Sequence, residues 1–410
     1  MTRSARFHPA ETRRHLLERG ILSGSFVRCC YRPFDDRCLY WHPETKLLDE
    51  KREDLFAAFK AADSFLTSRQ KAERSNEGTP FYVTRNLPDR HLTRPGSACF
   101  PMTWRPQDQG VLNSSPGPGG QAKVANLSTI ALDYLSGLCV ANSGVTPNAG
   151  GSVWMHSLAI GYSPAYLSEN ADGICQDWPR IPLPDSKELL LASAGLGRKI
   201  AALLDTETPF DVAPASRRQG KKAVETLAME QEPPGWWRYI GVPTHVDRKA
   251  LDEARDLAVT AGWGHAGKDG VTMPGKGRLI ERNYTPEELA GSPAVSPAEE
   301  EKSQQDAGAT GGAGAVLLGD RTCDVYLNDV AYWKNIPLRV WEYAIGGYQV
   351  IKKWLSYREE KLLGRPMTKE EVRWVQEMAR RIAAILLLEP ALDENYRVVK
   401  AHTYEWPKNA

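Results

Sequence analysis

The sequence predicts a mixed α/β fold of the α+β type, and three observations support this class. Apolar and polar residues alternate with a period of two across residues 27–41 and 325–333, as in half-buried strands. Apolar residues recur every three or four positions across residues 189–203 and 372–386, as on one face of a helix. Proline and glycine interrupt segments of both kinds along the chain. We therefore expect a strand-rich N-terminal part, a helical middle and a C-terminal α+β part with a long closing helix.

Composition divides the chain into five stretches. We expect a strand-rich part at 1–125, a helical part at 126–208, a mixed segment at 209–290, a flexible linker at 291–315 and an α+β part at 316–410. The linker is predicted because its Gly-, Ala-, Ser- and Glu-rich sequence has too little apolar surface to offset the entropy cost of ordering it.

The charge balance excludes a uniformly basic molecule. The 410 residues include 52 Lys and Arg against 51 Asp and Glu, so a nucleic-acid surface must come from local clustering. The seven cysteines are scattered and form no CxxC pair, which argues against a disulfide framework or zinc site and favours a reducing compartment. The N-terminus lacks the apolar core of a signal peptide, and no window approaches 18 apolar residues. We therefore expect a cytoplasmic protein that does not enter a membrane.

The first part of the chain is locally basic. Eight arginines face four acidic residues between Met1 and Trp41. We expect a helix over residues 9–19, followed by a hairpin whose turn contains Pro33. Arg32 and Arg37 flank this turn. Either can contact DNA or be held by a bidentate pair with Asp35, and the sequence leaves both alternatives open.

Four further helices are predicted along the chain. Prolines keep residues 178–184 extended, because the residue before a proline avoids helical backbone angles. Asp185, with Glu188 three positions later, is then expected to cap a helix that ends near Leu204. Shorter or more charged helices are expected at residues 51–64, 127–140 and 248–260.

Residues 341–360 carry the densest combination of aromatic residues and cations. Gly346 and Gly347 break the chain, and four apolar residues then share one face of a predicted helix: Tyr348, Ile351, Trp354 and Leu355. Three cations lie mostly on its other sides: Lys352, Lys353 and Arg358. Such a helix fits a surface that meets phosphate, and it equally fits an ordinary solvated helix.

The closing helix is predicted from its cap and its apolar spacing. Thr368 and Glu371 form a capping box, apolar residues repeat at helical spacing, and Pro390 is expected to end the helix.

No complete catalytic or metal site is predicted. The string from Gly262 to Asp269 is one residue short of a phosphate-binding loop, because Asp269 stands where a Ser or Thr hydroxyl is needed. Residues 232–235 lack the aromatic ring that an amino-methylating loop stacks on the target base. The acidic pairs at 49–51 and 359–361 are expected on exposed helix, and the eight histidines form no metal-binding spacing.

Several strings taken together resemble the C-terminal specificity (target-recognition) domains of Type ISP restriction–modification enzymes and related adenine-specific DNA methyltransferases. The resemblance covers about residues 10–400 and rests on these strings: YRPFDDRCLYW with LLDEKRE, WPRIPLP, MPGKGRLIERNYTPEE, VYLNDVAYWKNIPLRVWEYAIGGYQVIKKWLSYRE and LLEPALDENY. In that family the domain follows a nuclease, a helicase-like ATPase and an S-adenosylmethionine-dependent methyltransferase on one polypeptide. This sequence departs from that plan in lacking those modules, and in having Cys38 where an aromatic residue is usual.

The resemblance implies a sequence-specific DNA recognition module without its own catalytic site. It implies double-stranded DNA, and the methyltransferase and helicase/nuclease modules of the same system, as partners. S-adenosylmethionine would be bound only by a separate methyltransferase module, so no cofactor is expected on this chain. The expected DNA contacts are Arg32, Arg37, Lys276, Arg278, Lys352, Lys353 and Arg358. Two alternatives remain: a part of an adenine-specific methyltransferase whose cofactor site another chain completes, or a protein–protein adaptor that docks through residues 341–357.

Overall fold

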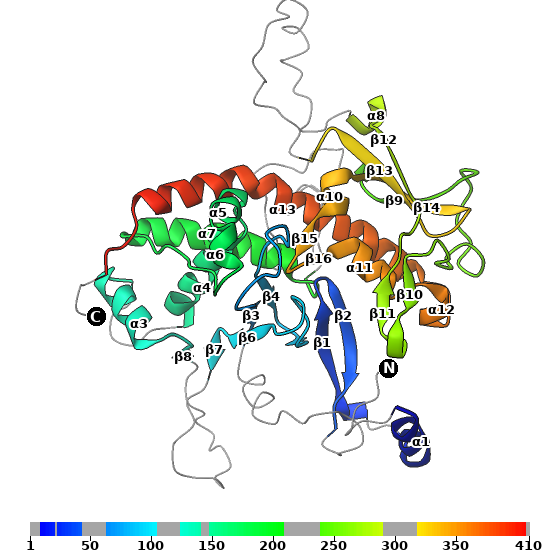
Figure 1. Ribbon diagram of the computed structural model, residues 1–410, viewed down its shortest axis with the longest axis horizontal. Helices are drawn as coiled ribbons and strands as arrows, with labels where there is room; N and C mark the ends of the chain where they lie inside the picture. The colour runs from blue at the N-terminus through cyan, green and yellow to red at the C-terminus, as the bar shows by residue number, and fades with distance from the viewer. Residues whose placement is uncertain are drawn as a thin grey trace, which may run out of the picture. The chain divides into compact units, whose positions relative to one another are not determined.

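The computed structural model describes residues 9–20, 23–42, 63–104, 124–140, 147–208, 238–289 and 318–406. It divides into two compact units. Unit 1 contains Met1–Asp205, Ile345–Tyr348 and Glu389–Ala410, and unit 2 contains Thr206–Ala344 and Gln349–Leu388. The mixed α/β class is confirmed, with strands in both the N-terminal and the C-terminal parts and a long closing helix (Figure 1). The five-part division stays a prediction. Its linker, residues 51–62 of the helix predicted at 51–64, and the 232–235 string lie outside the described residues.

Unit 1 begins with helix α1 (Pro9–Arg19) and three small sheets. The sheets have the strand orders β2-β1-β5, β4-β3-β6 and β7-β8. Their strands are β1 (Phe26–Arg32), β2 (Asp35–Tyr40), β3 (Phe65–Ser68), β4 (Tyr82–Thr84), β5 (Leu87–Pro88), β6 (Ala98–Pro101), β7 (Thr103–Trp104) and β8 (Val124–Ala125). The predicted hairpin is confirmed. Its turn is Pro33–Phe34, and Phe34 adopts a left-handed backbone angle with φ of 60°.

The helices of unit 1 follow these sheets. They are α3 (Thr129–Gly137), α4 (Pro147–Gly161), α5 (Pro164–Glu169), α6 (Ala171–Ile174) and α7 (Lys187–Leu204). Helices α4 and α7 pack so closely at Gly197 that no side chain fits there. A Cβ on Gly197 would lie 1.8 Å from the carbonyl oxygen of Met155. The cap of α7 lies one residue later than predicted. Ser186, and not Asp185, has the extended backbone of an N-cap, and its hydroxyl accepts from the Leu189 N–H.

Unit 2 is built on an antiparallel sheet with the strand order β12-β13-β14-β9. The strands are β9 (Val242–His245), β12 (Leu279–Asn283), β13 (Arg321–Tyr326) and β14 (Ala331–Pro337). Cys323, Val325, Trp333 and Ile336 are fully buried and form the sheet's contribution to the core. Shorter elements complete the unit: β10 (Gly264–Ala266), η4 (Lys268–Gly270), β11 (Thr272–Pro274), α8 (Pro286–Leu289), α10 (Leu338–Glu342), α11 (Val350–Ser356) and α12 (Glu360–Leu363).

The chain around Gly346 and Gly347 forms a tight turn. Strands β15 (Ala344–Ile345) and β16 (Tyr348–Gln349) pair across the two glycines, which have φ of 52° and 81°. Tyr348 therefore lies in β16, before the helix on which it was predicted. The two strand residues take the place of the first predicted helical turn, and α11 begins only at Val350.

No helix forms at residues 248–260, contrary to the prediction. The Asn328 side chain donates to the carbonyl oxygens of Asp256 and Ala258, at 2.8 and 2.7 Å. The Thr260 N–H donates to the carbonyl of Leu327. Backbone groups that a helix would pair internally are thus bonded to the β13–β14 turn, so tertiary contacts override the helical propensity of this segment.

Helix α13 (Lys369–Ala401) is longer than predicted. Its capping box is confirmed, since the Thr368 N–H donates to Glu371 at 2.9 Å and the Glu371 N–H donates to the Thr368 hydroxyl at 3.3 Å. Pro390 does not end the helix. Leu392, Tyr396 and Val399 beyond it are buried, and this packing outweighs the hydrogen bond that the proline removes.

Candidate nucleic-acid interface

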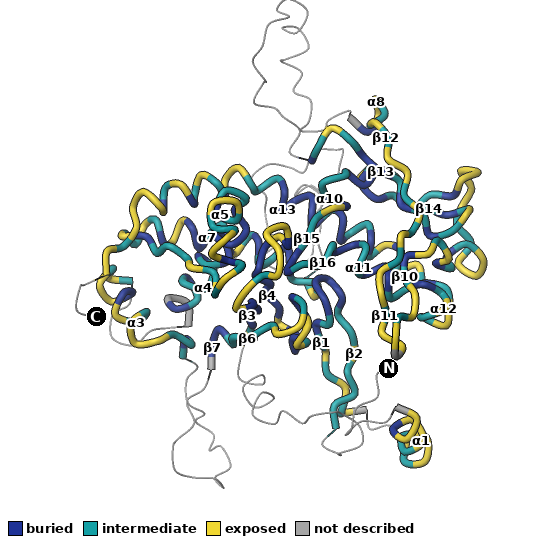
Figure 2. The backbone as a smooth tube through the Cα atoms, in the orientation of Figure 1, coloured by how far each residue is buried: buried dark blue, intermediate teal, exposed yellow. Residues whose placement is uncertain are grey.

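Strands β10 and β11 form a two-stranded antiparallel ribbon in unit 2. His265 pairs with Met273, and Ala266 pairs with Thr272. Between Gly264 and Arg278, every residue whose burial is described is exposed or half-buried (Figure 2). Successive strand residues point to opposite faces, so His265 and Met273 share one face while Ala266 and Thr272 share the other. The ribbon thus has no fully buried residue on either face among those described in this range.

The base of the ribbon is anchored by Trp263. Its side chain is fully buried, its indole N–H donates to the carbonyl of Tyr326 at 2.6 Å, and its ring meets Trp341 edge-on at 5.1 Å. Gly277 lies over this ring, with φ of 69°, and a Cβ there would be 2.0 Å from a ring carbon. The connection from β11 to β12 can therefore pass the indole only with a glycine at this position.

Glu359 ties the ribbon to the end of helix α11. Its carboxylate accepts the backbone N–H groups of Gly262, Trp263 and Gly264, at 3.2, 2.8 and 3.3 Å. The residue is only 6% exposed. The acidic pair at 359–361 was predicted on exposed helix, and for Glu359 this is wrong because the carboxylate is buried against backbone donors.

Helix α11 packs against both strands of the ribbon. The predicted apolar face is confirmed for Ile351, Trp354 and Leu355, which are at most 2% exposed. Lys353 places its ammonium 4.6 Å from the centre of the Tyr357 ring. Lys352 is half-buried and makes no hydrogen bond or ion pair with the residues that the structure describes.

The other predicted cations of unit 2 differ in whether they contact an acidic or aromatic side chain. Lys276 is exposed on the strand-to-strand connection after β11. Arg278 pairs with Asp329 at 2.8 Å and lies 4.2 Å from the centre of the Tyr326 ring. Arg358 stacks on Trp354 at 3.9 Å and donates to that residue's carbonyl at 3.4 Å. Lys276 thus lies on the connection after β11, and Lys352 and Lys353 lie on α11, the helix that packs against the ribbon.

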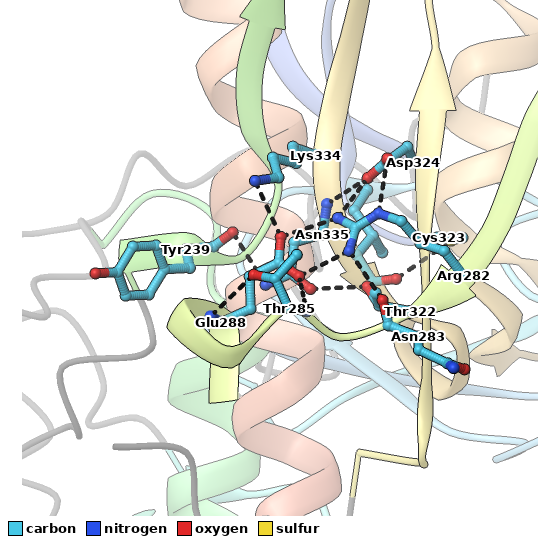
Figure 3. A network of polar contacts seen from close by, with 11 residues as sticks. Tyr239, Arg282, Asn283, Thr285, Glu288, Thr322, Cys323, Asp324, Lys334 and Asn335 are labelled. Atoms are coloured by element: carbon cyan, nitrogen blue, oxygen red, sulfur yellow. Dashed lines mark hydrogen bonds and ion pairs between the residues drawn. The ribbon is translucent and has the colours of Figure 1, made fainter. Parts of the chain in front are cut away.

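A partly buried ionic network holds the neighbouring sheet (Figure 3). Arg282 on β12 donates to both carboxylate oxygens of Asp324 and to both of Glu288, at 2.7–2.9 Å. Asp324 also accepts from the Asn335 N–H at 2.9 Å, and Lys334 pairs with Glu288 at 3.3 Å. Burial alone would raise the pKa of Glu288, but its hydrogen bonds with Arg282 and the Thr285 N–H hold that pKa below the usual range. The hydrogen bonds of Arg282 thus link β12 to β13 and α8.

The predicted cations of unit 1 are engaged within the unit. Arg32 is 7% exposed, pairs with Asp89 at 2.7 Å and stacks on Tyr31 at 3.9 Å. Arg37 donates twice to one oxygen of Asp35, at 3.1 and 2.6 Å, and its guanidinium lies 4.0 Å from the same Tyr31 ring. The pair with Asp35 weighed from the sequence is therefore formed by Arg37. No observation tests the predicted DNA contact of either arginine, and such a contact would require the arginine to leave an acidic partner.

The string from Gly262 to Asp269 forms strand β10 and the ribbon tip. A phosphate-binding loop connects a strand to a helix, whereas here a single 3₁₀ turn leads back into β11. The sequence singled out this string as a possible phosphate-binding loop and did not indicate that it forms one strand and the tip of a ribbon. His265, Lys268 and Met273 were missed as surface residues, although glycines at 262, 264, 267, 270, 275 and 277 signal a hairpin with close backbone approaches.

The described residues contain no cluster of three or more His, Cys, Asp or Glu able to hold a metal ion. Within the same ranges, every helix is too short or too polar to cross a bilayer. What the ribbon and α11 can do chemically is bind a polyanion, since both carry lysines and the ribbon is largely exposed.

A family model described as the Type ISP C-terminal specificity domain matches residues 5–259 and 263–384. The chain therefore belongs to this family, as the sequence strings predicted. Membership of a family of specificity domains supports a role in recognising a DNA target. No curated protein matches the chain.

Three solved structures are similar to the chain at low identity. The first is described as the ATP-dependent Type ISP restriction–modification enzyme LlaBIII bound to DNA, with 12% identity, a TM-score of 0.48, and 94% of this chain and 19% of that one covered. The second is a nuclease-deletion mutant of the Type ISP enzyme LlaGI with a DNA substrate mimic, with 13% identity, a TM-score of 0.45, and 91% and 25% covered. The third is a DrdV–DNA complex, with 17% identity, a TM-score of 0.48, and 95% and 29% covered. The chain spans less than a third of the length of each.

Proposed function

We propose that the chain recognises the DNA target sequence of a Type ISP restriction–modification system and so serves methylation-based phage defence. The observation that carries this proposal is the family match across nearly the whole chain. The basic side chains around the β10–β11 ribbon supply a physical means. Phosphate contacts position such a protein on the duplex, and base contacts select the sequence.

In this proposal the phosphate contacts come mainly from unit 2. Lys276, Lys352 and Lys353 are the leading candidates, and Lys268 at the ribbon tip joins them. Arg278 can join as well. Its pair with Asp329 is solvent-exposed, and such pairs contribute at most about 1 kcal/mol, so a phosphate can replace the aspartate.

The partners follow from the same proposal. Methylation and cleavage of the recognised DNA would be carried out by methyltransferase and helicase/nuclease modules of the same system, in the cytoplasm. S-adenosylmethionine would be bound by the methyltransferase module, and this chain would need no cofactor of its own.

A gel-shift titration of the 410-residue chain on mixed-sequence duplex DNA tests the proposal. We expect binding that weakens steeply with salt, and competition by one sequence above others. Reversing Lys352 and Lys353 to Glu should weaken binding at low salt without unfolding the chain. The matched control reverses Lys249 and Lys400, which are exposed and lie outside the ribbon and α11. Absence of binding, or equal effects of the two double variants, would contradict the proposal.

A further inference from the structure

We propose that the β10–β11 ribbon enters the major groove of the target DNA and reads base edges with the face that carries His265 and Met273. This inference rests on the proposed DNA recognition and assigns the element that performs it.

The dimensions and exposure of the ribbon fit that groove. Neighbouring strands lie about 5 Å apart, and the major groove, about 12 Å wide, admits a two-stranded ribbon, whereas the minor groove is about 6 Å wide. Between Gly264 and Arg278 the described side chains are exposed or half-buried, although the end of α11 covers part of one face. Helix α11, in contrast, buries one side against its own unit, so fewer of its side chains are available to contact bases.

The ribbon is held in place before any partner arrives. An isolated two-stranded hairpin is marginally stable in water. Here the Trp263 indole, the Glu359 carboxylate and the Gly275 N–H, which donates to the Trp263 carbonyl at 2.6 Å, fix the base of both strands. A fixed ribbon loses little conformational freedom on binding, which favours its use as a reading element.

Packing at the base decides which face points outward. A Cβ on Gly264 would lie 1.9 Å from the Ser356 carbonyl oxygen, so the face of Gly264 abuts the end of α11. By the strand alternation, Ala266 and Thr272 share that face. The opposite face carries the cross-strand pair His265 and Met273.

The outward side chains have the chemistry of base reading. Imidazole presents one donor and one acceptor when neutral, which can bond to the donors and acceptors on base edges. Met273 and Val271 are 46% and 44% exposed, and apolar side chains at this position can contact the thymine methyl group. Lys268 at the tip and Lys276 at the base flank them and would reach the phosphates. Asp269 is the only acidic residue between Gly264 and Arg278.

Selection from a library of duplexes with a randomised centre tests this assignment. The chain should enrich one site. The variant His265→Ala/Met273→Ala should lose preference at two or three adjacent base pairs, by about 10-fold or more at each, and keep the others. The matched control is Val246→Ala/Ile280→Ala, two exposed apolar residues of unit 2 outside the ribbon, which should enrich the original site.

Dimethyl sulfate footprinting of the unaltered chain on the enriched site adds a readout that does not depend on variant folding. Protection of guanine N7, in the major groove, should fall on the positions that the ribbon variant no longer reads. An unchanged site for the ribbon variant, or protection confined to adenine N3 in the minor groove, would overturn the ribbon assignment alone. Failure of the unaltered chain to bind or enrich any duplex would overturn the proposed function as well.

Discussion

The β1–β2 hairpin of unit 1 and the β10–β11 ribbon of unit 2 both carry cations beside a turn, but they use them differently. In the hairpin, Arg32 and Arg37 both stack on the Tyr31 ring and are paired with Asp89 and Asp35. In the ribbon, Lys268 and Lys276 are exposed. The more basic stretch of sequence therefore makes the more fully compensated surface.

The comparison shows that a local count of cations does not measure a positive surface. Arg32 is neutralised by Asp89, which lies 57 residues further along the chain and reaches it only through the parallel pairing of β1 with β5. The ribbon has few acids in its own sequence, and neighbouring carboxylates such as Glu359 and Asp324 are already bonded to backbone donors or arginines. The positive charge available to bind DNA therefore depends on which cations the folded chain places beside a carboxylate.

The largest effect is expected from Trp354→Ala, which removes the aromatic support beneath the ribbon side of unit 2. Trp354 is 2% exposed, and truncating a buried aromatic costs roughly 3–5 kcal/mol. Urea denaturation should show this decrease in stability, and hydrogen exchange should place it in unit 2. A decrease below about 1 kcal/mol would mean that α11 is not an anchored platform.

Acid should affect the two units at different pH values. His156 on α4 is fully buried, accepts from the Ser193 hydroxyl at 2.7 Å and donates to the Pro182 carbonyl at 2.8 Å. Burial lowers its pKa to about 4. In the unfolded chain this imidazole has an ordinary pKa of about 6.5 and is protonated below that pH, whereas in the folded chain it stays neutral down to about pH 4. Unit 1 therefore loses stability as pH falls from about 6.5 to about 4, by roughly 3 kcal/mol.

Unit 2 should respond at lower pH. The pKa of Glu288 is depressed, so its contribution is present above the ordinary pKa of Glu and is lost only as pH falls through the lowered value. Hydrogen exchange followed from pH 7 to pH 4.5 should show α7 destabilised before β13. The reverse order would contradict this account of the two buried sites.

A smaller stability effect is expected from Arg37→Ala. The Asp35 side chain is fully buried and would lose its ion pair with Arg37, at a cost of about 2 kcal/mol. Thermal unfolding should detect this cost while affinity for DNA, measured well below the melting temperature, stays unchanged. Weaker DNA binding with an unchanged melting temperature would instead identify Arg37 as a phosphate contact.

No effect is expected from S-adenosylmethionine, the cofactor that we assign to a separate module. Titration calorimetry of the 410-residue chain should show no binding at micromolar concentration. Measurable heat with saturation would favour the alternative in which the chain forms part of a methyltransferase site.

Local patterns predicted the elements whose signals are complete within a few residues. The helix over Pro9–Arg19, the hairpin around Pro33, the capping box at Thr368 and the buried face of α11 all have such signals. The errors arose where distant residues decided the outcome. The Asn328 side chain donates to carbonyl groups that would have accepted hydrogen bonds within the helix predicted at 248–260. Packing of buried residues beyond Pro390 allows α13 to continue past this proline.

The sequence named cations for the candidate site, and their contact with DNA stays a prediction, but it did not indicate the shape of the site. Lys276, Lys352 and Lys353 were named from sequence positions that lie far apart along the chain. That α11 meets the ribbon depends on Glu359 binding three backbone N–H groups, and no spacing rule signals such a contact. His265 and Met273 gave no separate signal because a strand of three residues is too short to show alternation.

The most direct test of the central claim is the salt dependence of binding to the enriched duplex, measured for two double variants. Lys268→Ala/Lys276→Ala should weaken binding and flatten the slope of log affinity against log salt by about one unit for each phosphate contact that the substitutions remove. Arg32→Ala/Arg37→Ala, measured below its melting temperature, should leave the slope unchanged. A flattened slope for the arginine variant and an unchanged one for the lysine variant would contradict the claim that unit 2 holds the DNA surface.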